Sequence, residues 1–311
     1  MTDAPPSRMQ APATPTMTRA RLRIAAALLG PARLLRSQTL QASERAALTL
    51  RATQPRMAQP EGVTFLIPLV GPHHVGDWDG VQARLRATLD SLLRQTDPRW
   101  RAVICCQTRP DMPDDPRLHY LPFDDPAPGN DKWRKLTALC DYLPRVGPHA
   151  GYTMSLDADD LLHPDMVATL MAQAKDGWLV GRGLVMDAGC GDIALAGPRS
   201  PALPLRKPFW KLCGSCMALR HDLANPACLP FLRAMVQHEH RMFPYLVALA
   251  GMEVQEFDSP MALYILNHGE NFGARRGRVG FKTRFVQRFK ITDPAMLAQI
   301  RSDFALDDSA P

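Results

Sequence analysis

The chain has 311 residues, of which 46% are hydrophobic and 22% are charged. This balance is ordinary for a soluble globular protein, so we expect one large domain or two modest ones with a sizeable core. The formal net charge is +6, but residues 1–60 hold nine arginines and two acidic residues, which leaves −1 for the remainder. The positive charge therefore belongs to an N-terminal extension and gives no support to nucleic-acid binding by the main domain.

The N-terminal extension has two parts with different composition. Residues 1–18 are rich in Pro, Thr and Ala, which predicts disorder. Residues 19–53 read as a helix that breaks near Gly30 and Pro31, and arginines alternate there with apolar residues. Three interpretations stay open for this basic amphipathic segment: peripheral contact with an anionic membrane surface, a solvated helix packed on the domain, or contact with a partner protein.

Signals for membrane insertion or export are weak in this sequence. The longest apolar stretch of the extension, residues 24–29, is far shorter than the roughly 20 residues of a transmembrane helix. Arg33 and Arg36 follow that stretch closely, which is unlike a signal peptide. With seven cysteines, an odd number, we expect a cytoplasmic protein with reduced thiols, attached at most to the inner face of the membrane.

From residue 62 onward the pattern is that of an α/β domain. Short apolar, β-branched segments at 63–68, 100–106, 118–121 and 152–156 predict buried strands. Helical spacing of apolar residues alternates with them at 81–95, 132–143 and 164–174. This alternation predicts a mostly parallel sheet flanked by helices, in which ligands bind beyond the carboxyl ends of the strands. Pro68, Gln107 and Asp157 stand at such ends.

An acidic cluster, Asp157-Ala158-Asp159-Asp160, follows the strand predicted at 152–156. Crowded carboxylates repel one another unless a cation or solvent reaches them, and Mg²⁺ prefers oxygen ligands. The Asp-x-Asp spacing turns Asp157 and Asp159 to the same side of an extended segment. Asp160 has a second interpretation, as the N-cap of the helix predicted at 164–174.

Three segments resemble the conserved blocks of family 2 glycosyltransferases: residues 64–68, 89–96 and 155–164. The resemblance covers residues 61–270 and implies a GT-A (Rossmann-like) fold. It also implies an inverting, hexosyl- or deoxyhexosyltransferase reaction from a nucleotide-diphosphate sugar to a saccharide or lipid-linked acceptor, assisted by Mg²⁺ or Mn²⁺. By the same resemblance, Asp159 is the main metal ligand, Asp157 lies near the ribose and the metal, and Pro68 borders the nucleobase pocket.

Four further residues take expected roles from their place in the family pattern. Gln107 stands where the family carries an acidic pair that contacts the base, so base identity is left open. Lys132 begins a helix that suits a diphosphate, or else it lies in a solvated first turn. Glu239 is expected to be the catalytic base, with an exposed charge cluster as the alternative. His268 is expected to bind the metal or diphosphate, with a structural role as the alternative.

The remaining motifs carry less chemistry. Cys213-Gly-Ser-Cys216 is expected to be a packed strand or turn on the acceptor side, since zinc or redox use would need other partners. Seven basic residues lie between 275 and 290, in a tail that predicts either a lid or a solvated helix. We therefore divide the chain into an extension (1–60), a GT-A domain (61–270) and a basic tail (271–311).

Two other functions compete with sugar transfer in surface polysaccharide or glycolipid synthesis. A nucleotidyltransferase would show a Gly-rich phosphate loop, but residues 69–74 contain only Gly71. A degenerate, non-catalytic protein that binds nucleotide-sugar at the membrane surface is left open by Gln107. Residues 210–215 and 268–271 are similar to rhamnosyltransferases, which adds a deoxyhexose donor to the possibilities. The sequence does not name the sugar, the acceptor or the linkage.

Overall fold

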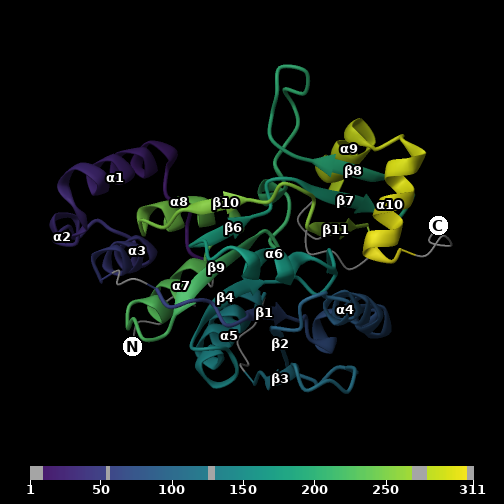
Figure 1. Ribbon diagram of the computed structural model, residues 1–311, viewed down its shortest axis with the longest axis horizontal. Helices are drawn as coiled ribbons and strands as arrows, with labels where there is room; N and C mark the ends of the chain where they lie inside the picture. Colours follow the sequence, from purple (N-terminus) through teal and green to yellow (C-terminus); the bar gives the residue numbers. More distant parts are fainter. Residues whose placement is uncertain (1–9, 54–56, 125–129, 268–278, 307–311) are drawn as a thin grey trace, which may run out of the picture.

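A seven-stranded sheet forms the centre of the protein, in the order β10-β6-β9-β4-β1-β2-β3 (Figure 1). The computed structural model describes residues 10–53, 57–124, 130–267 and 279–306. The strands of this sheet are β1 (Val63–Pro68), β2 (Trp100–Cys106), β3 (Leu118–Pro122), β4 (Ala150–Ser155), β6 (Gly177–Leu179), β9 (Met217–Asp222) and β10 (Val254–Glu256).

Strands β1 to β4 are all parallel, and β10 is parallel to β6. Among the described strands of this sheet, only β9 is antiparallel to its neighbours, β4 and β6. Strand β1 is buried along almost its whole length, which requires cover on both faces. The expected α/β class, a mostly parallel Rossmann-like sheet flanked by helices, is confirmed.

The helices that flank the sheet are α4 (Trp78–Leu93), α5 (Lys132–Val146), α6 (Met166–Ala172), α7 (Cys228–Val236) and α8 (Phe243–Leu249), with single 3₁₀ turns at η1 (Pro72–His74), η2 (Phe209–Lys211) and η3 (His240–Met242). Helix α4 begins where the Asp77 carboxylate accepts a hydrogen bond from the Gly80 amide at 2.8 Å. It buries Leu85, Leu89 and Leu92 along one side. Helix α5 packs against β1, β2 and α7.

A second, four-stranded sheet has the order β5-β11-β7-β8. Its strands are β5 (Asp160–Leu162), β7 (Gly183–Asp187), β8 (Ile193–Ala196) and β11 (Ala262–Leu266), and it is covered by α9 (Val279–Phe289) and α10 (Pro294–Phe304) (Figure 1). Ile300 and Phe304 of α10 share a small core with Leu161, Leu184 and Leu263 of this sheet. The basic tail is therefore helical and packed in its described part, residues 279–306.

The N-terminal extension forms α1 (Thr16–Leu29), α2 (Pro31–Leu34) and α3 (Ala42–Thr53). Helix α3 packs against α7 and α8 and buries Glu44, whose carboxylate accepts hydrogen bonds from Thr14 at 2.6 Å and Tyr245 at 3.0 Å. The expectation of disorder through residue 18 is wrong for residues 10–18, because Thr14 is an internal partner of Glu44 and α1 begins at Thr16. Among the described residues, no helix is long and apolar enough to cross a membrane.

Candidate functional site

The carboxyl ends of β1, β2 and β4 meet at one edge of the main sheet. Pro68 at the end of β1 lies opposite Cys105 of β2, and Leu66 lies opposite Ser155 at the end of β4. The polar residues that follow these strands, Gln107 and Asp157, therefore emerge at the same edge. Such an edge is the usual ligand-binding position of a parallel α/β sheet.

Asp157 is held in its charged form by a lysine from the start of α5. Its Oδ1 accepts a hydrogen bond from Lys132 Nζ at 2.6 Å, and its backbone amide donates to Ser215 Oγ at 2.8 Å. Burial opposes ionisation of this carboxyl, but the charge and hydrogen bond of Lys132 outweigh it and lower the pKa of Asp157 below its usual value. The structure thus brings together two of the expected donor-binding residues, Lys132 and Asp157.

Asp160 has the opposite electrostatic character although it is only three residues away. It is fully buried, and its Oδ2 accepts hydrogen bonds from Ser215 Oγ at 2.5 Å and Cys213 Sγ at 3.0 Å. Burial, reinforced by the charges of Asp159 and Asp157, raises the pKa of Asp160 well above its usual value. Asp160 begins β5, and Asp165 precedes α6, so the alternative of Asp160 as a helix cap is wrong.

Asp159 completes the cluster and is partly exposed. Its charge contributes to the raised pKa of Asp160 and, after burial, to the raised pKa of Tyr264 in β11. The Tyr264 hydroxyl accepts a hydrogen bond from Lys282 Nζ of α9 at 2.5 Å. One basic side chain of the C-terminal tail therefore faces the acidic cluster through this tyrosine.

The Cys213-Gly-Ser-Cys216 turn contacts the acidic cluster. Cys213 and Ser215 both donate hydrogen bonds to Asp160, and a Cβ on Gly214 would come within 3.2 Å of Asp157 Oδ2. The expectation of a packed turn is confirmed, but its contacts are with the acidic cluster. All seven cysteines are free thiols. The sequence did not predict that Cys213 and Ser215 bind Asp160, and its one local signal was Gly214 between them.

Gln107 is partly exposed and forms a polar group with the buried side chains of Asp131 and Lys135. Its Nε2 donates to Asp131 Oδ2 at 2.6 Å, and its Oε1 accepts from Lys135 Nζ at 2.8 Å. Lys135 also donates to the carbonyl oxygen of Leu69 at 2.6 Å and pairs with Asp131 at 2.9 Å. Burial would raise the pKa of Asp131, but Lys135 and Gln107 outweigh it and lower that pKa. A carboxylate is thus present beside Gln107, supplied by the residue before α5.

The residues around Glu239 contribute an imidazole to the same charge cluster. His240 exerts a charge effect on Asp157, and burial together with the charge of Lys132 lowers the pKa of His240 to about 3. Its Nε2 is buried and has no hydrogen-bond partner among the described residues. Glu239 precedes η3 and is partly exposed. Its role as catalytic base stays a prediction, and His268 lies outside the described residues.

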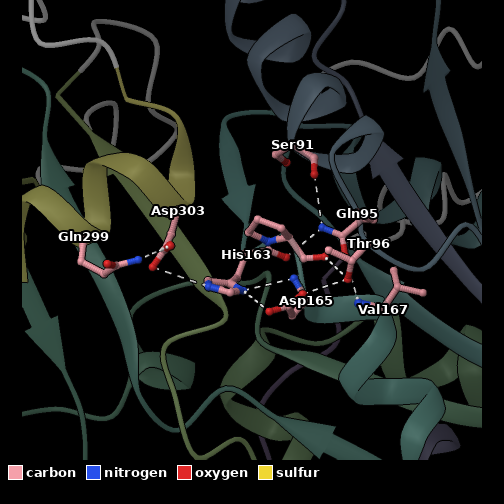
Figure 2. A network of polar contacts seen from close by, with 9 residues as sticks. Ser91, Gln95, Thr96, His163, Asp165, Val167, Gln299 and Asp303 are labelled. Carbon is pink, nitrogen blue, oxygen red and sulfur yellow. Dashed lines mark hydrogen bonds and ion pairs between the residues drawn. The ribbon is translucent and has the colours of Figure 1, made fainter.

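A polar network joins residues 163–167, which follow the acidic cluster, to the residues at the end of α4 (Figure 2). Gln95 Nε2 donates to the carbonyl oxygens of His163 at 2.8 Å and Ser91 at 3.2 Å, while its Oε1 accepts from the Val167 amide at 2.9 Å. On the other side, His163 Nε2 lies 3.7 Å from the Asp303 carboxylate of α10. Two of the segments that carry the family resemblance therefore contact each other, and this contact positions the strand that follows the acidic cluster.

The donor set of the cluster consists of carboxylate oxygens, which suit Mg²⁺ or Mn²⁺. Asp157 and Asp159 are both partly exposed, and Lys132 lowers the pKa of Asp157, whereas Asp160 is buried and its pKa is raised. No group of three or more His, Cys, Asp or Glu side chains in the described part of the chain is arranged to hold a metal ion. Two carboxylates plus substrate phosphates is an ordinary arrangement for Mg²⁺.

Comparisons with known proteins place the chain among distant structural neighbours only. No family model matches it, and no curated protein matches it. It is similar to Rv0371c from Mycobacterium tuberculosis H37Rv, at 13% identity and a TM-score of 0.35 over 74% of this chain and 100% of that one. It is also similar to the glycosyltransferase GlyE of Streptococcus pneumoniae TIGR4, at 14% identity and a TM-score of 0.29 over 74% of this chain. The match spans 52% of the GlyE chain, and likenesses this distant assign no activity.

Proposed function

We propose that this protein transfers a sugar from a nucleotide-diphosphate sugar to a saccharide or lipid-linked acceptor, with inversion at the anomeric carbon. The observation that carries the proposal is the Lys132–Asp157 ion pair beside the partly exposed Asp159, at the carboxyl edge of a parallel sheet. A cationic side chain and two oxygen ligands at one edge suit a metal-bound diphosphate.

In this proposal Asp157 and Asp159 would hold Mg²⁺ or Mn²⁺, which would supply positive charge for the diphosphate of the donor. Lys132 already neutralises Asp157. With a cation bound to Asp157, Lys132 would be available to contact a phosphate as a point charge. Asp160 positions this arrangement: it accepts hydrogen bonds from Ser215 and Cys213, and Ser215 in turn accepts from the Asp157 amide.

The nucleotide base is proposed to lie toward Pro68 and Gln107. The Gln107 side chain is held in place, because one Nε2 hydrogen is donated to Asp131 and Oε1 accepts from Lys135, which leaves the second Nε2 hydrogen for a base edge. A fixed polar side chain recognises a base edge without an ordering cost at the moment of binding. The acceptor hydroxyl is proposed to lose its proton to Glu239, with His240 as a neutral neighbour of the diphosphate.

Nucleotide binding is tested by thermal unfolding with UDP, GDP or dTDP, each with and without Mn²⁺. We expect one nucleotide to raise the melting temperature only when Mn²⁺ is present, and Asp159→Ala to abolish that rise. Asp258→Ala removes an exposed carboxylate elsewhere and serves as the matched control. If no nucleotide raises the melting temperature with any divalent ion, the proposal fails.

Transfer is tested by the release of nucleoside diphosphate from nucleotide-sugars. Glu239→Gln should retain the nucleotide-induced melting shift while turnover falls on the order of a hundredfold or more, the usual contribution of a general base. Unchanged turnover would exclude Glu239 as the base. If the wild type binds nucleotide-sugar but leaves it intact with every acceptor, the non-catalytic alternative replaces this one.

A further inference from the structure

One side of helix α1 exposes a row of large apolar side chains. Met17, Ile24 and Leu28 are 68%, 60% and 78% exposed. Their spacing places them on one face of the helix, which spans Thr16–Leu29. Helix α1 lies at the outer end of the molecule, beyond α8 and away from the second sheet (Figure 1).

The opposite side of α1 is held by the domain, so the apolar row has a defined direction. Ala26 is 1% exposed, and Leu22 packs against the main core. The Arg19 Nε donates to the carbonyl oxygen of Thr14 at 2.7 Å, and its guanidinium lies 6.0 Å from the centre of the Tyr245 ring in α8. Since these contacts fix the rotation of the helix, Met17, Ile24 and Leu28 point outward.

The charged side chains of residues 10–43, the segment that contains this row, are all basic. Arg21 lies on the same face, four residues after Met17, and both Arg21 and Arg23 are exposed. Arg33 and Arg36 are exposed just beyond the helix. No acidic residue occurs between positions 10 and 43, and the next carboxylate, Glu44, is buried and hydrogen-bonded.

We propose that α1 docks this protein on an anionic lipid bilayer, with the helix axis parallel to the membrane surface. Met17, Ile24 and Leu28 enter the boundary between headgroups and acyl chains, while Arg21 and Arg23 contact lipid phosphates. An exposed apolar row flanked by arginines is the pattern that binds at this boundary, and positive charge selects anionic lipid. At 14 residues the helix is too short to cross the bilayer, so it lies in the interface.

The experiment is sedimentation of the full chain with phosphatidylcholine vesicles that contain roughly one-third phosphatidylglycerol. We expect Met17→Ser/Ile24→Ser/Leu28→Ser to weaken partitioning by on the order of a hundredfold, since three apolar side chains lose their insertion. Arg21→Glu/Arg23→Glu should weaken it by at least about tenfold, and wild-type binding should fall at high salt. Because the substituted residues are exposed, the melting temperature should stay unchanged.

The matched control replaces three other exposed apolar residues, in Leu203→Ser/Leu205→Ser/Met296→Ser, and should bind vesicles as the wild type does. Equal loss in this control, or equal binding to pure phosphatidylcholine vesicles, overturns the proposal. The proposal is also overturned if the protein does not bind vesicles but forms a dimer, measured by light scattering, and the α1 triple substitution dissociates that dimer. The readout needs no sugar donor, so its outcome is independent of the proposed transfer reaction.

Discussion

His221 is a buried histidine that should make the stability of this protein depend on pH below neutrality. It lies in β9 and is 0% exposed, with Nε2 3.1 Å from the Pro148 carbonyl oxygen and Nδ1 2.8 Å from Thr153 Oγ1. Because a carbonyl oxygen only accepts, Nε2 carries the proton and Nδ1 accepts from the Thr153 hydroxyl. The neutral imidazole is therefore fully hydrogen-bonded, and burial lowers its pKa from 6.5 to about 4.

The size of the effect follows from this shift. Between about pH 6.5 and pH 4 the unfolded chain binds a proton at His221 that the folded chain does not bind, so stability falls as the pH falls. Each unit of pKa difference corresponds to about 1.4 kcal/mol, and the shift from 6.5 to about 4 therefore costs about 3 kcal/mol of unfolding free energy. Above about pH 6.5, His221 is neutral in both the folded and the unfolded chain, so it causes no further change of stability with pH.

Urea unfolding of wild type and His221→Gln across this pH range measures the contribution directly. At neutral pH the variant should be less stable by about 1–3 kcal/mol, because it disturbs two buried hydrogen bonds. That deficit should shrink by about 3 kcal/mol as the pH falls to about 4. The control His149→Gln removes an exposed histidine nearby and should follow the wild type. Parallel losses of stability in wild type and His221→Gln would refute the reasoning.

Three further predictions follow from buried residues. Lys135→Met should lower the unfolding free energy by about 3–5 kcal/mol, because it leaves the Asp131 carboxylate buried without its cation. Chemical denaturation measures this loss, and the double variant Lys135→Met/Asp131→Asn should recover part of the lost stability. Gly183→Ala should cost about 1–3 kcal/mol in the same assay because the new Cβ meets the Phe209 ring, and a loss near zero would contradict that packing. The raised pKa of Asp160 should make the wild type lose stability as the pH rises from about 4. Asp160→Asn lacks this titration, so its stability relative to wild type should increase over that range, by at most about 1.4 kcal/mol per pH unit. Melting curves in EDTA check this last prediction, and identical pH profiles for the two proteins would refute it.

The elements of the sheet were predictable because their signals are local. The apolar segments predicted at 63–68 and 100–106 coincide with β1 and β2, and the helix predicted from Lys132 begins at that residue. Parallel pairing of those strands then brings their carboxyl ends together, as the α/β alternation implies. The positions of Gln107 and Asp157 at one edge follow from this topology.

The partners of the acidic residues could not be predicted in the same way. Asp160 is of a residue type that often caps helices, yet it lies in β5, where it is buried and accepts hydrogen bonds from Cys213 and Ser215. Thr14 lies in a segment whose composition predicts disorder, yet Glu44 of α3 holds it. Each outcome depends on a residue distant in the chain, and periodicity within a short window carries no information about it.

The sequence alone therefore determined the α/β class and the place of the acidic cluster at a strand end. Only the tertiary structure decided which carboxylate of the cluster has its pKa lowered and which has its pKa raised. Lys132, 25 residues before Asp157, lowers one pKa, while burial against a turn more than fifty residues further along raises the other. The physical reason is that ionisation depends on the charges and the solvent around a group in space, and the folded chain alone brings these together.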